Sequence, residues 1–311
     1  MNFPPFFDSI NSSNLIGLDK NFEFISKLYS KQNLPQVLML TGNKGSGKST
    51  LVNHFLHSIF DTKNYDKNNL IILENSSLIK QLQNNIFPNV VYIKGDDFKS
   101  VKVEDIRSLK SRILQSTISN KDRFIIFDDA ELFNQNSLNA LLKIIEEPSK
   151  KNYFFLINNK SKPLLDTIRS RSIEFKIILG EDQRLEIINK LVSTLKLELI
   201  LDPKASKLTP GNFVKFNYIC LEYDIIPAHN LVKNISLLLN LYKKNKEILF
   251  INVLFFIVDY YFDHLKDNNL YKNGKIFEIK KYILNNLNNF ILYNISQNSL
   301  INAINEKLNY E

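Results

Sequence analysis

Residues Val37–Thr50 read VLMLTGNKGSGKST, and this stretch decides the fold. Three of the chain's eight glycines fall between Gly42 and Gly47, directly after a short apolar run. The run has the length of a buried strand, and the residues from Lys48 to about Phe60 have the pattern of a helix. The glycine stretch satisfies G-x-x-x-x-G-K-[ST] in the strand–loop–helix setting that this pattern requires. The sequence therefore predicts a phosphate-binding loop.

The residue types in this loop suit a nucleotide phosphate chain. Glycines let successive backbone N–H groups converge on phosphate oxygens, and the following helix presents its positive N-terminal end. We expect Lys48 to reach the β- and γ-phosphates and the hydroxyl of Ser49 to coordinate Mg²⁺. The residues expected to bind the nucleotide are Gly42, Asn43, Lys44, Gly45, Ser46, Gly47, Lys48, Ser49 and Thr50.

Two acids follow a second apolar run, RFIIFDDAE at Arg123–Glu131. A carboxylate at the end of a neighbouring strand is the usual partner of a phosphate loop, because it helps to hold the magnesium ion. Asp128 is the candidate for this role, and Asp129 stands beside it.

Strand-like and helix-like segments alternate along the first half of the chain. Further strands are expected at Asn89–Ile93, Tyr153–Asn159 and Ser172–Ile178, and helices at Val103–Gln115 and around SLNALLKIIEEP. This alternation predicts an α/β fold with a parallel sheet. After about residue 179 the pattern is helical, so we expect a P-loop domain over residues 1–178, a small helical lid domain over 179–212 and a helical C-terminal domain over 213–311.

Composition excludes several classes of protein. One cysteine in 311 residues, Cys220, rules out an internal disulfide and a multi-cysteine zinc module. The formal charge of +8 comes from scattered lysines and is weak support for a nucleic-acid partner.

His54 and His57 have a spacing that metals can use, but no third ligand is evident, and we expect a pair on a helix surface. The apolar run Ile248–Phe262 carries Asn and Asp and is short for a bilayer, so we expect a buried helix.

Three later stretches occur in order and carry a resemblance: FDDAELFNQNSLNALLKIIEEPS, FFLINN and LLDTIRSRSIEF. They resemble the AAA+ ATPase core of bacterial clamp-loader subunits, and the match runs from about Leu15 to Lys176. The resemblance implies that Asp128 is the magnesium acid, that Asn158 occupies the sensor position, and that Arg171 reaches into a neighbouring subunit's nucleotide site. It also implies a helical lid and a C-terminal collar that holds the assembly together.

Departures from that family pattern narrow the resemblance. The catalytic glutamate expected beside the magnesium acid is Asp129, one methylene shorter, and a displacement of about 1 Å can cost roughly a hundredfold in a positioned reaction. The lid arginine expected shortly after Gly211 is missing, since Asn212 and Lys215 follow instead. The family's zinc module is absent, so no zinc is expected. A retained Arg171 beside a weakened site is similar to the delta-prime family, whose members act as stators.

The resemblance implies ATP or ADP with Mg²⁺ as cofactor and a cytoplasmic protein with no membrane partner. It implies gamma/tau and delta subunits as direct partners within the DNA polymerase III holoenzyme, and the sliding clamp and primed DNA as partners of the complex. Little or no ATPase activity is expected of the chain alone. Two alternatives stay open: an ATP-hydrolysing motor subunit of the gamma/tau type, and a P-loop kinase or related enzyme acting on a small substrate.

Overall fold

The computed structural model describes residues 3–95, 106, 121–146, 151–267, 273–293 and 295–309. The helix expected over Val103–Gln115 lies outside the described residues, apart from Ile106. The chain forms two compact units. One contains the described residues up to Leu191 together with Thr209–Asn212, and the other contains Val192–Leu208 and the described residues from Phe213 onward. The three-domain division at residues 178 and 212 stays a prediction.

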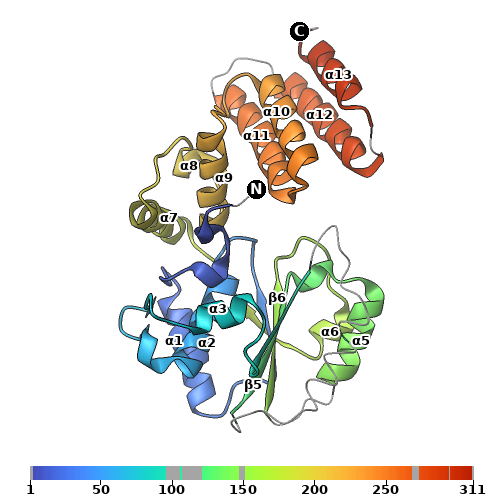
Figure 1. The fold of residues 1–311 in the computed structure, drawn as a ribbon. Helices are drawn as coiled ribbons and strands as arrows, with labels where there is room; N and C mark the ends of the chain where they lie inside the picture. The colour runs from blue at the N-terminus through green and yellow to red at the C-terminus, as the bar shows by residue number, and fades with distance from the viewer. Residues whose placement is uncertain are drawn as a thin grey trace. The chain divides into compact units, whose positions relative to one another are not determined.

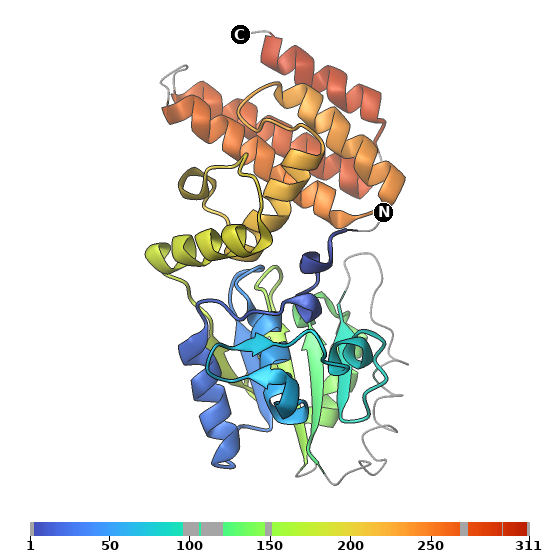
Figure 2. The same ribbon diagram turned by 60° about the vertical axis from the view of Figure 1, so that its left-hand side comes forward.

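Five of the described strands form one parallel sheet in the order β4-β5-β6-β1-β7. The strands are β1 (Val37–Thr41), β4 (Val90–Lys94), β5 (Arg123–Asp128), β6 (Asn152–Asn158) and β7 (Ile173–Lys176). A short antiparallel pair, β2 (Tyr65–Asp66) and β3 (Ile71–Ile72), stands apart from this sheet (Figure 2). All five sheet strands were predicted from apolar runs, and the α/β class is confirmed. Because the strands are parallel, their carboxyl ends meet at one edge of the sheet.

Helices cover both faces of the sheet (Figure 1). On one face lie α1 (Asp19–Ser30), α2 (Lys48–Phe60) and α3 (Leu78–Gln83), and on the other lie α5 (Gln135–Ile145) and α6 (Asp166–Arg169). Short 3-10 turns stand between them: η1 (Pro5–Phe7), η2 (Ser9–Asn11), η3 (Thr62–Asn64) and η4 (Ala130–Leu132). The helix predicted from Lys48 to Phe60 is confirmed as α2.

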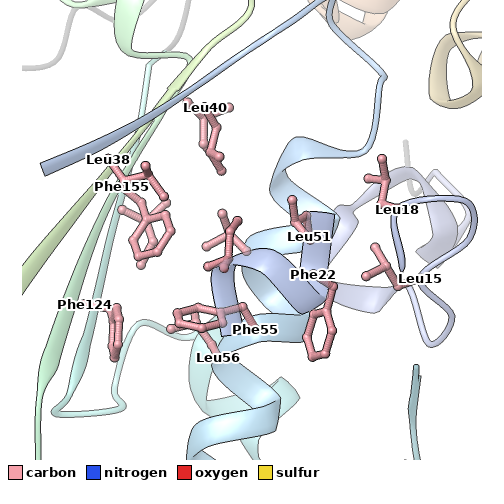
Figure 3. Packing of buried hydrophobic residues seen from close by; sticks show 14 of the residues in the cluster. Leu15, Leu18, Phe22, Leu38, Leu40, Leu51, Phe55, Leu56, Phe124 and Phe155 are labelled. Atoms are coloured by element: carbon pink, nitrogen blue, oxygen red, sulfur yellow. The ribbon is translucent and has the colours of Figure 1, made fainter. Parts of the chain in front are cut away.

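Alternate residues of β1, β5 and β6 enter two different cores, as the period of a strand requires. Leu38 and Leu40 of β1 pack with Leu51 and Phe55 of α2 on one face (Figure 3). The residue between them, Met39, points to the other face and joins the core formed with α5 and α6. Every residue of β1 and β5 is buried, so the chain segments that follow these strands start from rigid positions.

The second unit is helical. The helices after the sheet are α7 (Glu181–Leu195), α8 (Pro203–Ser206), α9 (Pro210–Glu222), α10 (Leu231–Asn245), α11 (Ile248–Asp267), α12 (Asn273–Tyr293) and α13 (Gln297–Asn309). The apolar helix α11 packs between α10 and α12 (Figure 1). Cys220 lies in the core of this unit, and burial raises the pKa of its thiol to about 12.

Among the described residues, one helix segment, Ile248–Lys266, is long and apolar enough to cross a membrane by length and composition, with a mean hydropathy of 1.6. A single such segment is weak support for a span, because the core helix of a soluble protein passes the same test. Phe250, Val253 and Ile257 of this segment are fully buried, as the prediction of a core helix expects.

Candidate functional site

The phosphate loop leaves β1 at the carboxyl edge of the sheet and leads directly into α2. The N–H of Gly42 donates to the carbonyl of Asn158 at 3.2 Å, which fixes the loop to the end of β6. Gly45 and Gly47 have φ angles of 83° and 89°, in the left-handed region that favours glycine. The scarce glycines therefore stand where the backbone has to take this conformation.

Lys48 points into the loop that precedes it. Its ammonium donates to the carbonyls of Gly42 and Asn43 at 2.7 and 2.8 Å, and the residue is only 3% exposed. Burial lowers the pKa of Lys48 to about 8, although the nearby carboxylates of Asp128 and Glu131 favour the charged form. An ammonium ringed by oxygen acceptors in a concave loop can turn to phosphate oxygens without leaving the site.

Ser49 and Asp128 face each other across the base of the loop. The Ser49 hydroxyl lies 3.2 and 3.1 Å from the two carboxylate oxygens of Asp128. The hydroxyl of Tyr92, on the neighbouring strand β4, also donates to Asp128. Burial and this carboxylate hold the pKa of Tyr92 well above its usual value. Carboxylate and hydroxyl oxygens are the ligands that Mg²⁺ prefers, so this donor set fits a magnesium ion.

Asp129 is buried beside this pair, with both carboxylate oxygens engaged. One oxygen accepts from the amide of Asn159, and the other lies 3.5 Å from the ammonium of Lys44. Its backbone has a φ of 50°, a conformation that Asp tolerates better than most residues. Burial raises the pKa of the Asp129 carboxyl above its usual value, and the charge of Lys44 opposes this shift.

The two asparagines that end the FFLINN stretch have different contacts. The side chain of Asn158 accepts from the backbone N–H of Lys160 at 2.8 Å, so it caps its own turn. The side chain of Asn159 makes the contact to Asp129. The resemblance implied the sensor role for Asn158 and did not single out Asn159, although two consecutive amides at a strand end are a signal for both.

Glu131 shapes the same edge without reaching the phosphate loop. One of its oxygens accepts from the N–H of Asn159 at 3.0 Å and from the hydroxyl of Ser161 at 2.9 Å. Its other oxygen is buried and has no hydrogen-bond partner among the described residues. Glu131 therefore positions Asn159, the residue that contacts Asp129.

A segment far along the chain packs against the phosphate loop. The hydroxyl of Thr209 donates to the carbonyl of Lys44 at 2.6 Å, and the N–H of Gly211 donates to the carbonyl of Gly45 at 2.8 Å. A Cβ on Gly211 would lie 3.0 Å from that Gly45 oxygen, so the two backbones are in close contact. Asn212, at the expected lid-arginine region, also lies beside Gly45. No sequence pattern predicted these bonds.

Arg171 follows α6 and is partly exposed. Its guanidinium forms an ion pair with Glu146 at 2.9 Å and donates to the carbonyl of Thr167 at 3.0 Å. Within the described part of the chain, these contacts come from the residue that follows α5 and from α6, and the phosphate loop supplies none. The side chain of Arg171 is 38% exposed.

The interpretation of His54 and His57 as a surface pair was wrong, because both rings are fully buried. The ring of His54 bonds to the hydroxyl of Tyr65 and to the carbonyl of Ser12, which ties the N-terminal segment to α2. His57 bonds to the carbonyl of Asn53. Over the described residues, no group of three or more His, Cys, Asp or Glu side chains is arranged to hold a metal ion.

A phosphate loop after an inner strand of the parallel sheet and an acid at the end of β5 together define a P-loop nucleotide-binding domain. The sequence pattern of the family described as "DNA polymerase III, delta subunit" matches residues 17–178. Because this match covers more than half of the 311 residues, the chain belongs to that family.

Individual relatives agree with this assignment. The chain is 23% identical over 289 residues to the DNA polymerase III subunit delta' of Buchnera aphidicola from Acyrthosiphon pisum, covering 88% of this chain and 86% of that protein. It is 26% identical over 183 residues to the gamma subunit of Buchnera aphidicola from Schizaphis graminum, covering 58% of this chain and 48% of that protein. The predicted resemblance to the delta-prime family is thus confirmed.

A solved structure of a gamma subunit-related protein from Thermotoga maritima is 15% identical and has a TM-score of 0.47, with 91% of this chain and 96% of that chain covered. At this level of likeness, the family assignment rests on the sequence match.

Proposed function

We propose that this chain is a delta-prime-like stator of a DNA polymerase III clamp loader, which binds adenine nucleotide and completes a neighbouring subunit's ATPase site with Arg171. The observation that carries the proposal is a contrast within one domain. The phosphate loop and the magnesium acid are assembled, whereas both oxygens of Asp129 are engaged by Asn159 and Lys44. We expect a site of this kind to bind adenine nucleotide and to hydrolyse it slowly.

The chain's own residues have distinct roles in binding. Lys48 would exchange its contacts with loop carbonyls for contacts with phosphate oxygens, and the loop N–H groups would orient the phosphate chain. Ser49 and Asp128 would hold a magnesium ion, which when bound offsets the charge of the phosphates. The ligand that follows from these roles is ATP or ADP with Mg²⁺.

Hydrolysis in this chain's own site is expected to be slow. An acid that polarises the attacking water needs an oxygen directed to that water, within about 2.6–3.2 Å. Asp129 is one methylene shorter than a glutamate, and its two oxygens already accept from an amide and face an ammonium. The lid segment offers Asn212 close to the phosphate loop and no arginine among residues 209–212.

Arg171 is available to a second subunit. The guanidinium is planar and offers five N–H donors, a geometry suited to phosphate oxygens that lysine does not reproduce. Partial exposure and the position after α6 support a role in trans. The partners of this proposal are gamma/tau and delta subunits, with the sliding clamp and primed DNA reached through the complex in the cytoplasm.

The test compares the lone chain with the assembled complex. Equilibrium binding should show Mg²⁺-dependent nucleotide binding by the lone chain, and a phosphate-release assay should show negligible turnover. In the complex, Arg171→Ala should lower the DNA- and clamp-stimulated ATPase partially and clamp loading more strongly, because one site loses a group that contributes on the order of 10³–10⁵ in rate. Arg169→Ala is the matched control and should be milder. Wild-type clamp loading by Arg171→Ala complexes would refute the stator role.

A gamma/tau-type motor is the second candidate, supported by the complete phosphate loop and by the 26% identity to a gamma subunit. The same release assay separates the two, since robust turnover by the lone chain favours the motor. A small-substrate kinase is disfavoured by membership of the DNA polymerase III family.

A further inference from the structure

Arg171 is held by an acid that the family comparison does not single out. Its guanidinium forms a 2.9 Å ion pair with Glu146, the C-cap residue directly after α5. Its other terminal nitrogen donates to the carbonyl of Thr167 at 3.0 Å. The guanidinium is therefore held at two points, by the residue that caps α5 and by a carbonyl of α6.

These two contacts fix the orientation of the Arg171 guanidinium. A free arginine side chain loses rotamer entropy when it is ordered, so a group that orders it beforehand favours docking. The ion pair and the carbonyl bond use two of the five N–H donors, and the arginine is 38% exposed. Donors and accessible surface thus remain for a phosphate of the neighbouring subunit.

We propose that Glu146 is a positioning residue for Arg171, holding the guanidinium in the orientation in which it enters the neighbouring subunit's nucleotide site. This inference rests on the proposed function of Arg171 in trans. The opposite role is the rival: a carboxylate beside the guanidinium could weaken its attraction for phosphate, and removing it would then raise activity. The sign of the effect decides between the two.

The perturbation is Glu146→Gln, which keeps the side-chain length and removes the charge. The quantity to measure is the Arg171-dependent ATPase, defined as the maximal rate of the wild-type complex minus that of the Arg171→Ala complex. An exposed ion pair of this kind corresponds to about a two- to fivefold effect. Glu146→Gln should lower the Arg171-dependent rate by about this factor and leave the nucleotide concentration for half-maximal rate unchanged, because the finger acts on the transition state.

The chain offers a matched control. Asp166 and Arg169 form a second exposed ion pair nearby, at 3.1 Å. Asp166→Asn removes this pair without touching Arg171 and should leave the ATPase unchanged. A loss of assembly or stability would be shown by co-migration of each variant with its partners, and neither substitution should alter it.

The double variant Glu146→Gln with Arg171→Ala completes a double-mutant cycle. It should match Arg171→Ala alone, because Glu146 acts through the arginine. An unchanged or raised rate in Glu146→Gln overturns the inference, and so does a double variant slower than Arg171→Ala. If Arg171→Ala itself changes neither ATPase nor clamp loading, the proposed stator function fails. If it lowers both while Glu146→Gln has no effect, only the positioning role fails.

Discussion

The contact between Gly211 and the phosphate loop predicts an unusual cost for a small substitution, Gly211→Ala. The new methyl carbon would lie 3.0 Å from the carbonyl oxygen and 3.1 Å from the Cα of Gly45. Both are backbone atoms, so the loop or the start of α9 has to move by a few tenths of an ångström. Overpacking of this kind costs about 1–3 kcal/mol.

A second effect has the opposite sign. Alanine favours the helix and restricts the unfolded chain, which stabilises by about 0.4–1 kcal/mol where no clash occurs. The net expectation for Gly211→Ala is therefore a loss of about 1–2 kcal/mol in the free energy of unfolding of this unit. Gly45 belongs to the phosphate loop. If its displacement makes nucleotide binding less favourable by roughly 1 kcal/mol, nucleotide affinity should fall about fivefold.

Two glycines provide controls for these measurements. Gly180 lies in the same unit directly before α7, and Gly274 is the second residue of α12, as Gly211 is of α9. A Cβ at either position would meet nothing within 4 Å. Denaturant unfolding and equilibrium nucleotide binding should show Gly180→Ala and Gly274→Ala unchanged or slightly stabilised. If Gly211→Ala behaves like the two controls in both assays, the close contact between this segment and the phosphate loop is refuted.

Three further predictions concern other parts of the chain. In titration calorimetry, Lys48→Ala should weaken nucleotide binding about a hundredfold or more, since two charge-assisted hydrogen bonds to phosphate oxygens, of at least 1.5 kcal/mol each, are lost. Lys44→Ala, at an exposed side chain of the same loop, is the control and should have a smaller effect. Burial lowers the pKa of His54 to about 3, so the unfolded chain takes up the proton first and stability should fall by roughly 2 kcal/mol between pH 6.5 and 5. His54→Gln should lower the free energy of urea unfolding at pH 7 and make this slope shallower, while His57, whose pKa burial also lowers, keeps part of the slope; an unchanged slope would contradict the assignment. Leu292 is 71% exposed on α12. Leu292→Asp should weaken co-migration with partner subunits on sizing chromatography without altering the melting temperature. Ile226→Asp, at an exposed position of the same unit, is the control, and equal losses of co-migration in the two variants would argue against a specific collar surface.

The sequence alone determined the fold class and the centre of the site. Strands β1, β5 and β6 were readable because each is a short, nearly continuous apolar run, as expected for strands buried on both faces. The phosphate loop was readable because its residue types and spacing are local and its flanking elements were predictable. Asp128 followed from its place at the end of a strand, and the structure brings it to Ser49 at hydrogen-bond distance.

Only the tertiary structure decided which side chains meet. The contact of Asn159 with Asp129, the bonds of Thr209 and Gly211 to the phosphate loop and the ion pair of Arg171 with Glu146 all join residues well separated in sequence. Periodicity and motifs report local preferences, and they do not specify which of two adjacent amides turns inward at a strand end.

The burial of His54 has the same origin. The three-residue spacing of His54 and His57 was compatible with a pair on a helix surface. The residues that bond to His54 come from other parts of the chain: Ser12 precedes α2 in the sequence, and Tyr65 follows it. Polar groups become buried when the folded backbone supplies hydrogen-bond partners, and those partners are placed by packing. Local pattern therefore determined the elements of this protein and its phosphate loop, and packing determined the residues that surround and support them.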